Sequence, residues 1–272
     1  MKIIDNNPVI ILGMHRSGTS LLANLLHESG VFMGHDINSH FESTDYLKVN
    51  QYLLKMAHAF WDSPNNFNYL LNNKSRTTSL IEEVKNRVYS RDFQLSYNGW
   101  KRYFLNNKNE KWGWKEPRTS ITFPIWKEVY PNAKYIIVYR NGIDVASSLK
   151  YREQKRQNLI NKIYYSNRCL DINQAFNLWE EYNGFIRQNM SNIDESNIYE
   201  LKYEELLANP SSQLQNILNG FLSLNVKKRA KKIETIRSDN AYKFLNDLDL
   251  KNLYLEKKKN KMMVELGYSE IL

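Results

Sequence analysis

A short segment near the start of the sequence combines glycines with hydroxyl and cationic side chains. It runs from Gly13 to Ser20, after the apolar residues Val9–Leu12 and before a leucine-rich stretch. Glycines let the backbone approach an anion closely, and the N-terminus of a following helix adds about half a positive charge. The segment therefore predicts a phosphate-binding loop. Its candidate ligands are His15, Arg16, Ser17, Gly18, Thr19 and Ser20.

The spacing of this loop matches the Gly-x-x-x-x-Gly of nucleoside triphosphatases, but the lysine of that motif is missing. Thr19 stands at the lysine position, and the nearest cation is Arg16, inside the loop. A planar guanidinium holds two oxygens at once, so it is a suitable replacement for a flexible ammonium group. A plain strand-to-helix turn with a surface arginine is the alternative for the loop taken alone.

A second candidate site follows a buried-strand pattern at residues 135–139. Arg140 stands at the carboxyl end of this strand, where open α/β sheets bind ligands. Ser148 lies about two turns into the helix that follows. Both side chains reach one phosphate if this helix packs back toward the strand end. Taken singly, Arg140 is also able to cap a carbonyl group, and Ser148 to be a helix-face hydroxyl.

Together the two segments resemble the nucleotide site of the sulfotransferase family, bacterial type, whose donor is 3'-phosphoadenosine 5'-phosphosulfate (PAPS). In that family the glycine loop binds the 5'-phosphosulfate, and an Arg-Asn-x-x-Asp-x-x-x-Ser motif binds the 3'-phosphate. Arg140 and Ser148 have this spacing, with Asn141 and Asp144 in place. The resemblance therefore implies a PAPS site, with the bisphosphate PAP as the nucleotide product.

Two weaker resemblances add a lysine and a tyrosine to the site. Residues 112–118 are similar to the Lys-Asp-Pro segment of protein-tyrosine and bacterial sulfotransferases, which implies that Lys115 lies beside the transferring group. Residues 201–206 are similar to a Tyr-Glu-Asp-Leu segment whose tyrosine, here Tyr203, lies near the nucleotide.

One departure from the family concerns the C-terminal part of the chain. The Arg-Lys-Gly-x-x-Gly segment that cytosolic small-molecule sulfotransferases use on the 3'-phosphate is not found there. Arg237 or the basic run near Lys227 are the candidates to replace it. The phenol and steroid branch of the family is therefore disfavoured.

Sulfuryl transfer is expected to need in-line geometry, cations near the leaving phosphate and a base for the acceptor proton. Arg16 and Lys115 are the candidate cations. Since a sulfate ester carries less negative charge than a phosphate monoester, no metal ion is expected.

The base is sought in the segment after the first helix, where protein-tyrosine sulfotransferases carry a catalytic glutamate. This position makes Glu42 the first candidate and His40 the second, because histidine suits proton abstraction near neutral pH. Asp36, Glu116 and a nucleophile that needs no strong base stay open.

The acceptor is expected to be a saccharide or a glycolipid. The loops at residues 34–43 and 62–74, which would frame its pocket, contain polar and aromatic residues that suit sugars and suit peptides equally. Trp61, Trp100 and Trp112 are candidates to stack on a sugar ring.

The elements that must position these residues are short apolar runs that alternate with helical periodicity. Strands are predicted at residues 9–12, 111–115, 135–139 and 197–201, and helices around residues 21–26, 46–60, 81–88, 176–185, 214–221 and 253–266. Two Asn- and Lys-rich stretches, residues 65–74 and 106–111, are predicted to be turns. The alternation predicts an α/β three-layer sandwich with a central, mostly parallel sheet, which the resemblance identifies as the P-loop-NTPase-like sulfotransferase fold.

Length and composition favour one globular domain over residues 1–272. The chain has 272 residues, 42% of them hydrophobic, with acceptor-side loops and helices expected around residues 34–110 and a basic helical part at residues 211–272. The single cysteine, Cys169, excludes an internal disulfide, and the histidines show no metal-ligand spacing. No apolar run is long enough to span a membrane, and we expect the protein in the cytoplasm.

The formal charge of +9 is concentrated between Lys227 and Lys261, where twelve basic residues face five acidic ones. Two alternative functions follow from the loop and the charge. A P-loop kinase-like phosphotransferase using ATP and magnesium is disfavoured by Thr19. A nucleic-acid-binding protein using the basic C-terminal region is disfavoured because no aromatic residues alternate with the lysines, which fit a solvated helix face. The sequence gives no oligomeric state.

Overall fold

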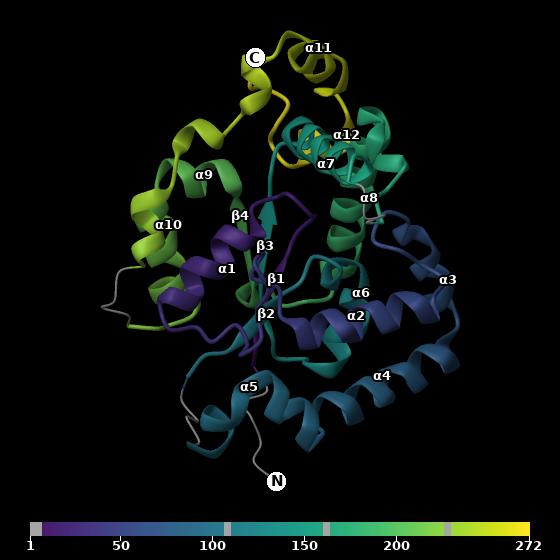
Figure 1. Cartoon of the computed structure of the whole chain (residues 1–272), viewed down its shortest axis with the longest axis vertical. Helices are drawn as coiled ribbons and strands as arrows, with labels where there is room; N and C mark the ends of the chain where they lie inside the picture. The colour runs from purple at the N-terminus through teal and green to yellow at the C-terminus, as the bar shows by residue number, and fades with distance from the viewer. Residues whose placement is uncertain (1–6, 106–109, 160–163, 226–229) are drawn as a thin grey trace.

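A sheet of parallel strands forms the centre of the molecule (Figure 1). The computed structural model describes residues 7–105, 110–159, 164–225 and 230–272. Within these residues the sheet has four strands in the order β2-β1-β3-β4, and every neighbouring pair is parallel. The strands are β1 (Val9–Leu12), β2 (Gly113–Lys115), β3 (Lys134–Tyr139) and β4 (Ile198–Lys202). Each coincides with a predicted apolar run, so the prediction of a parallel α/β sheet is confirmed.

The first strand shows why the sheet must be covered on both faces. Alternate side chains of a strand point to opposite sides of the sheet. Ile10 and Leu12 belong to the hydrophobic core on one side, and Val9 and Ile11 belong to the core on the other. All four side chains are fully buried. A strand with polar residues on one face would not fit between two such cores.

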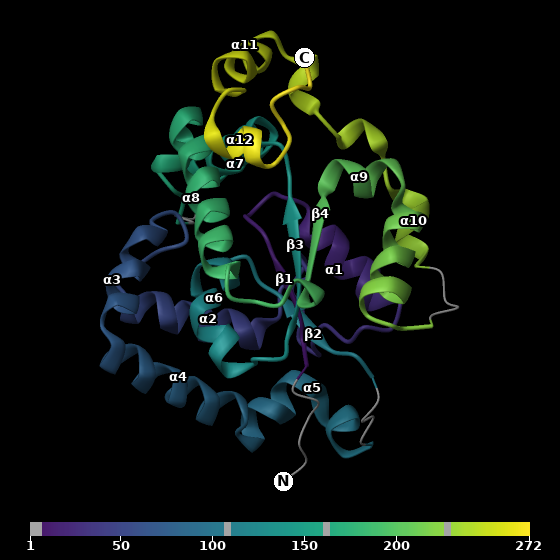
Figure 2. The ribbon, with the colours of Figure 1, turned by 180° about the vertical axis from the view of Figure 1, so that it is seen from behind.

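Helices cover both faces of this sheet and complete the three predicted layers. One face is covered by α1 (Thr19–Glu28), α9 (Tyr203–Ala208) and α10 (Pro210–Gln215), seen on the left of Figure 1. The other face packs against α2 (Thr44–Met56), α6 (Thr119–Val129), α7 (Gly142–Gln157) and α8 (Ile172–Met190), seen from behind in Figure 2. The remaining helices lie farther from the sheet: α3 (Phe67–Asn72), α4 (Lys74–Val88), α5 (Arg91–Leu105), α11 (Leu248–Lys257) and α12 (Lys261–Glu265).

The start of α7 is fixed by an asparagine cap. The Asn141 side chain accepts hydrogen bonds from the N–H groups of Ile143 and Asp144, at 3.0 and 3.4 Å. Such a cap satisfies N–H groups that have no partner inside the helix, so α7 begins almost directly after β3. Arg140 is therefore held at the carboxyl end of the strand, and Ser148 follows on the helix.

Two local predictions are wrong. Residues 65–74 are not a simple turn, because α3 and the first residue of α4 lie there. Phe67 and Leu70 anchor α3 in the core, and the Asn73 side chain caps α4 by accepting from the N–H of Arg76. The helix expected at residues 253–266 is broken in two, because the Asn260 side chain accepts from the N–H of Met262 and starts α12.

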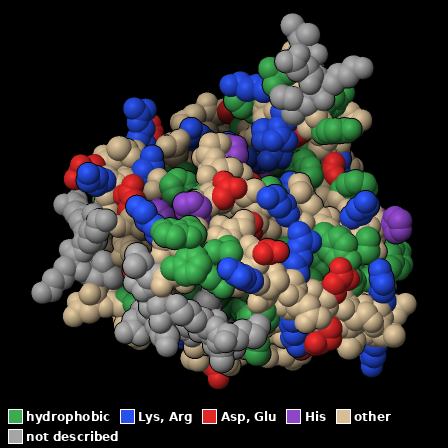
Figure 3. All heavy atoms as spheres, turned by 60° about the horizontal axis from the view of Figure 1, so that its bottom comes forward, with side chains coloured by type: hydrophobic (Ala, Val, Ile, Leu, Met, Phe, Trp, Pro, Cys, Tyr) green, Lys and Arg blue, Asp and Glu red, His purple; other side chains and the backbone are tan. Residues whose placement is uncertain are grey.

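Residues 106–109 of the turn predicted at 106–111 lie outside the described residues. Among the described helices, none combines the length and the apolar character that crossing a membrane requires. On the face shown in Figure 3, basic and acidic side chains are interspersed with hydrophobic ones rather than gathered by sign.

Candidate active site

A pocket of about 450 Å³ opens at the carboxyl ends of β1, β2 and β3. This is the position at which open α/β sheets bind ligands. Most of the predicted site residues line it, although they come from distant parts of the chain: His15, Arg16, Gly18, Thr19, Ser20, His40, Glu42, Lys115, Arg140 and Tyr203.

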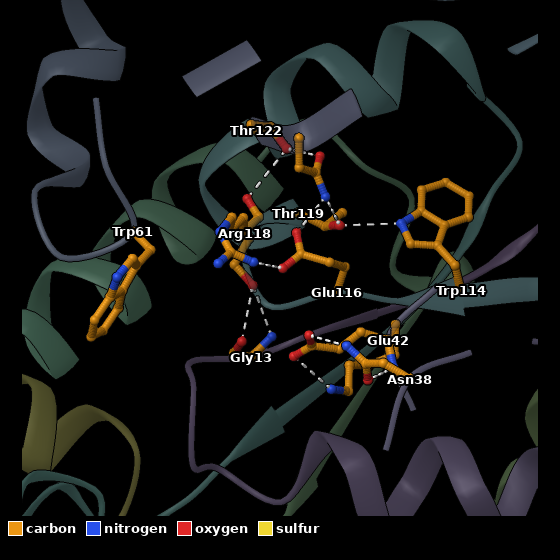
Figure 4. A network of polar contacts seen from close by, with 12 residues as sticks. Gly13, Asn38, Glu42, Trp61, Trp114, Glu116, Arg118, Thr119 and Thr122 are labelled. Carbon is orange, nitrogen blue, oxygen red and sulfur yellow. Dashed lines mark hydrogen bonds and ion pairs between the residues drawn. The ribbon is translucent and has the colours of Figure 1, made fainter. Parts of the chain in front are cut away.

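The glycine-rich loop is shaped by close contacts with its neighbours. Gly18 has φ 91°, and a Cβ at this position would overlap the Tyr203 ring, so only glycine fits. At the other end of the loop, the Gly13 N–H donates to Ser120 Oγ at 2.9 Å, which ties the loop to α6 (Figure 4). Helix α1 begins at Thr19. Its first N–H groups therefore lie next to the pocket, where an anion is favoured.

Arg16 connects the two predicted nucleotide motifs. Its Nε atom donates to Ser148 Oγ on α7 at 2.8 Å. Its backbone has φ 72°, a left-handed conformation that costs a non-glycine residue about 1 kcal/mol or more. The loop is thus held in a strained shape that directs the Arg16 side chain to α7, and strain of this kind is typical of functional sites.

Arg140 is held by several partners between the loop and the C-terminal part of the chain. Its Nη1 atom donates to the Arg16 carbonyl at 3.1 Å, and its Nη2 atom donates to Asp144 and to the Asn240 carbonyl, each at 3.3 Å. The guanidinium carbon lies 4.7 Å from the centre of the Tyr203 ring. Among the described residues, Arg140 Nε has no hydrogen-bond partner although it is buried. The guanidinium is therefore oriented before any ligand arrives.

A buried ion pair lies deeper in the pocket. Lys115 is 1% exposed, and its Nζ atom lies 3.3 Å from Glu42 Oε1. Asn38 orients the carboxylate by donating from Nδ2 to Glu42 Oε2 at 2.9 Å, while its Oδ1 atom accepts from the Glu42 N–H (Figure 4). Burial alone raises the pKa of Glu42, but the positive charge of Lys115 and the hydrogen bond from Asn38 outweigh it, and the pKa is lowered. Burial also lowers the pKa of Lys115, against the opposing charge of Glu42.

The other candidate bases are placed differently. His40 is exposed at the edge of the pocket, and its backbone N–H donates to Asn38 Oδ1. Asp36 is exposed and is not among the residues that line the pocket. Glu116 is fully buried and accepts from Asn50 Nδ2 at 2.7 Å, so it contributes to the packing beneath the pocket.

Glu116 also holds an arginine that the sequence alone did not assign to the site. Arg118 Nη1 donates to Glu116 Oε1 at 2.6 Å, and Arg118 lines the pocket (Figure 4). Burial raises the pKa of Glu116, and the charge of Arg118 opposes this rise. The buried Glu116 carboxylate thus has Arg118 as its cationic partner.

Further pocket residues were missed by sequence reasoning. Pro117, Arg152 and Arg156 line the pocket together with Trp61, which was predicted only as a sugar-stacking candidate. Arg152 and Arg156 follow Ser148 by four and eight positions on α7, so the helical repeat from Ser148 was a signal for both.

Some predicted residues lie outside the pocket lining. Ser17 is 1% exposed, and its backbone N–H donates to the Met14 carbonyl at 3.2 Å. Trp100 is 71% exposed on α5, and Trp112 is buried beside Trp114, so neither of these tryptophans is among the lining residues.

The candidates for the missing C-terminal segment are also separate from the pocket. Lys227 lies outside the described residues, and Arg237 is exposed and is not among the lining residues. The C-terminal part instead reaches the site through backbone groups. Asp144 accepts from the N–H groups of Lys243 and Phe244, at 3.2 and 2.9 Å. In the part of the chain that the structure describes, no three His, Cys, Asp or Glu side chains are grouped as metal ligands.

Comparison with known proteins identifies relatives of this chain and of this fold. The sulfotransferase family profile matches residues 8–227. The sulfotransferase domain from the curacin biosynthetic pathway is 17% identical over 89% of this chain and 81% of that chain, with a TM-score of 0.50. A sulfotransferase from Alicyclobacillus acidocaldarius is 12% identical over 98% of this chain and 97% of that chain, with a TM-score of 0.54. No curated protein matches the sequence. At these identities the solved structures show a shared fold.

Proposed function

The chain belongs to the sulfotransferase family, and we propose that it transfers the sulfuryl group of PAPS to a hydroxyl group of a saccharide or glycolipid. The observation that carries this proposal is the hydrogen bond from Arg16 Nε to Ser148 Oγ, because it joins two motifs that lie 132 residues apart. Arg16 and Arg140 line one pocket, which also holds the ion pair of Lys115 and Glu42, whereas Ser148 is not among the lining residues. Such a pocket offers donors for two separate phosphate groups and a base beside them.

In the proposed complex, the glycine-rich loop binds the 5'-phosphosulfate. The N–H groups at the start of α1 and the hydroxyl groups of Thr19 and Ser20 donate to its oxygens. Arg140 and Ser148 bind the 3'-phosphate. Tyr203, whose ring lies beside both Gly18 and Arg140, packs against the nucleotide between them.

The residues of the pocket then have distinct parts in the transfer. The acceptor oxygen attacks the sulfur atom, the bond between sulfur and the bridging phosphate oxygen breaks, and the electron pair leaves on the phosphate of PAP. Arg16 and Lys115 stabilise the negative charge that develops on this oxygen. The acceptor proton passes to a carboxylate oxygen of Glu42.

The ion pair explains how a carboxylate of low pKa can serve as a base. With Lys115 at 3.3 Å, Glu42 has little tendency to take up a proton. When Lys115 turns to the leaving phosphate oxygen, Glu42 loses the largest charge that stabilises it, and its pKa rises because only Asn38 and Arg118 then oppose the effect of burial. Its proton affinity therefore increases at the moment at which the acceptor hydroxyl must be deprotonated. His40, at the edge of the pocket, is the second candidate for this role.

The saccharide acceptor is supported by Trp61 and by the polar lining around it. An aromatic ring exposed in a pocket provides a flat apolar surface on which the C–H face of a sugar packs. Trp61 is half-buried and lines the pocket, with 5.1 Å between its ring centre and that of His15.

We also propose that residues 1–272 act as one domain. Its C-terminal part contacts the nucleotide side of the pocket, because the Asn240 carbonyl accepts from Arg140 and Asp144 accepts from the Lys243 N–H. The Tyr268 hydroxyl donates to Glu204, which follows Tyr203. Removal of the C-terminal part would expose these groups.

The proposal is tested by calorimetric titration with PAP, ATP and ADP, each with and without magnesium. We expect micromolar binding of PAP without metal, because the pocket supplies its own cations. The Lys48→Met variant, altered at an exposed lysine on α2, serves as the control for preparation and folding. Binding of ATP that depends on magnesium, together with no response to PAP, would overturn the proposal in favour of a kinase.

A further inference from the structure

We infer that the acceptor carries a negatively charged group, a carboxylate or a phosphate, which binds to Arg152 and Arg156 on the face of α7 that continues from Ser148 past Trp61. This inference rests on the proposed function, since it concerns the acceptor of the same reaction. It adds a binding site for an oxyanion to a pocket that already accounts for both phosphate groups of the donor.

The two arginines extend the nucleotide side of the pocket along α7. Ser148, Arg152 and Arg156 recur every four residues, so they lie on one face of the helix. Ser148 contacts Arg16 in the glycine-rich loop. Arg152, one turn farther on, lies over Trp61, with 4.7 Å between its guanidinium carbon and the ring centre. The face therefore leads from the donor side of the pocket to the tryptophan proposed to hold the acceptor.

The charges around these arginines are not balanced. Three other pocket cations, Lys115, Arg118 and Arg140, each have a carboxylate of their own. Arg152 and Arg156 instead share Glu153, whose Oε1 atom lies 2.5 Å from Arg152 Nε and 3.3 Å from Arg156 Nη1.

The shared carboxylate is fully buried, and its second oxygen is already used. Glu153 Oε2 accepts from the Ser166 N–H at 2.8 Å. Two guanidinium groups thus have one negative charge between them, and one positive charge is in excess at the pocket wall. Among the described residues, Arg16 is the other pocket cation that has no carboxylate within ion-pair distance, and the 5'-phosphosulfate accounts for it.

Unsatisfied polar atoms lie at the same place. Within the described part of the chain, Arg152 Nη2 and His15 Nε2 are buried and have no hydrogen-bond partner. His15 is 8% exposed and lines the pocket beside Trp61. Burial, followed by the positive charges of Arg152 and Arg118, holds the pKa of His15 well below its usual range, so the ring is neutral near pH 7. Because an unpaired buried polar group is unfavourable, both atoms favour a ligand that hydrogen-bonds to them.

The chemistry of the ligand follows from that of its partners. A guanidinium group held against an aromatic ring presents a rigid, planar set of N–H donors, which matches the paired oxygens of a carboxylate or a phosphate. A neutral sugar hydroxyl would leave the excess positive charge without a counterion in a partly buried setting. The structure therefore favours a uronic acid, a sugar phosphate or an acceptor with the same charged group.

The test compares charged and neutral probes on protein saturated with PAP. Glucose, glucuronic acid and glucose 1-phosphate are titrated calorimetrically at constant ionic strength, and benzyl alcohol, benzoate and phenyl phosphate form a second set without a sugar ring. We expect an anionic probe to bind about tenfold or more tightly than its neutral counterpart. A preference for glucuronic acid and benzoate indicates a carboxylate, and one for the phosphate esters indicates a phosphate.

Matched variants on α7 locate the effect. Arg156→Gln is expected to remove the preference for anionic probes while the affinity for PAP stays within about twofold, since Glu153 keeps Arg152 as its partner. Lys155→Gln removes the same charge from an exposed neighbour and is expected to keep the preference. Equal thermal stability of the variants excludes unfolding as the cause.

Several outcomes would overturn the inference, and they differ from failure of the proposed function. Equal binding of charged and neutral probes would overturn it, as would a preference that Lys155→Gln abolishes as fully as Arg156→Gln. A large loss of PAP affinity in Arg156→Gln, with no preference among the probes, would assign the arginines to the nucleotide. Absence of PAP binding to the unaltered protein would instead contradict the proposed sulfotransferase reaction itself.

Discussion

The two sides of the pocket are built in different ways. The side proposed to bind the nucleotide, called the nucleotide side, consists of short continuous segments. The loop from Gly13 to Ser20 supplies helix N–H groups, and Arg140 and Ser148 are separated by two turns of α7. The acceptor side consists of single residues from distant segments. Lys115 pairs with Glu42 across 73 residues, and Arg152 packs on Trp61.

This difference indicates how the two sides bind their ligands. Backbone N–H groups at a helix start recognise any phosphate of the right shape, and they change little when side chains are replaced. On the acceptor side, binding and catalysis are proposed to depend on charged side chains in ion pairs. A single substitution can remove one partner of such a pair. We therefore expect substitutions on the acceptor side to change turnover or acceptor choice, and substitutions on the nucleotide side to change the affinity for PAP.

The largest effect is expected for Lys115→Met. This change removes the cation next to the leaving phosphate oxygen and leaves the largely buried Glu42 carboxylate without its partner. We expect turnover to fall by about 100- to 1000-fold and the affinity for PAP to fall by about tenfold or less, since PAP retains the phosphate oxygen that Lys115 contacts. Single-turnover kinetics and calorimetry measure the two quantities, with Lys48→Met as the matched control. Loss of PAP affinity equal to the loss of turnover would break the distinction between the two sides.

The next largest effect is expected for Glu42→Gln. The amide keeps the shape of the side chain but cannot take up the acceptor proton, so turnover should fall by about 100-fold while PAP binds normally. His40→Gln is the comparison, because His40 lies at the edge of the same pocket. Normal turnover of Glu42→Gln together with a large loss in His40→Gln would transfer the role of base to the histidine.

A smaller effect, on binding alone, is expected for Arg140→Ala. The variant loses a charge-assisted contact to the 3'-phosphate, which corresponds to about 2 kcal/mol or roughly 30-fold in the affinity for PAP. Because Arg140 also donates to the Asn240 carbonyl, thermal melting must show that the C-terminal part stays in place. Arg187→Ala, altered at a half-exposed surface arginine, is the control. Unchanged PAP affinity would remove Arg140 from the nucleotide side.

The nucleotide side could be predicted from the sequence because its signals are local. The strands Val9–Leu12 and Lys134–Tyr139 are apolar runs, the glycine spacing is explicit, and Arg140 and Ser148 stand at a fixed interval. Signals of this kind can be recognised in the sequence without knowing how the chain packs. The predicted sheet agrees with the structure, and Arg16 and Arg140, one from each motif, line the same pocket.

The acceptor side could be predicted only in part because tertiary packing creates it. Glu42 and Lys115 were each proposed from the resemblance, but no pattern in the sequence pairs them. Nothing near Arg152 identifies Trp61 as its neighbour. The C-terminal contact is harder still to predict. Arg237 or the basic run near Lys227 was expected there, but the Asn240 carbonyl is the group that accepts from Arg140. A carbonyl group has no signature in the sequence, because every residue carries one.

The smallest effect concerns stability, and it tests the ion pair without any substrate. The pKa of Glu42 is lowered in the folded protein, so the unfolded chain binds more protons than the folded one as the pH falls toward the acid range. The stability that Glu42 contributes is therefore present above its ordinary pKa and is lost as the pH falls through the lowered value. We expect Glu42→Gln to melt at a lower temperature than the unaltered protein at pH 7, and the gap to close as the melting experiments move toward pH 3. Burial raises the pKa of Glu116, and the charge of Glu42 adds to this rise, so the loss of that charge offsets a small part of the expected gap. A gap that stays constant over this range would show that Lys115 does not stabilise the carboxylate, and the acceptor side would then lack the charge pair on which its proposed chemistry depends.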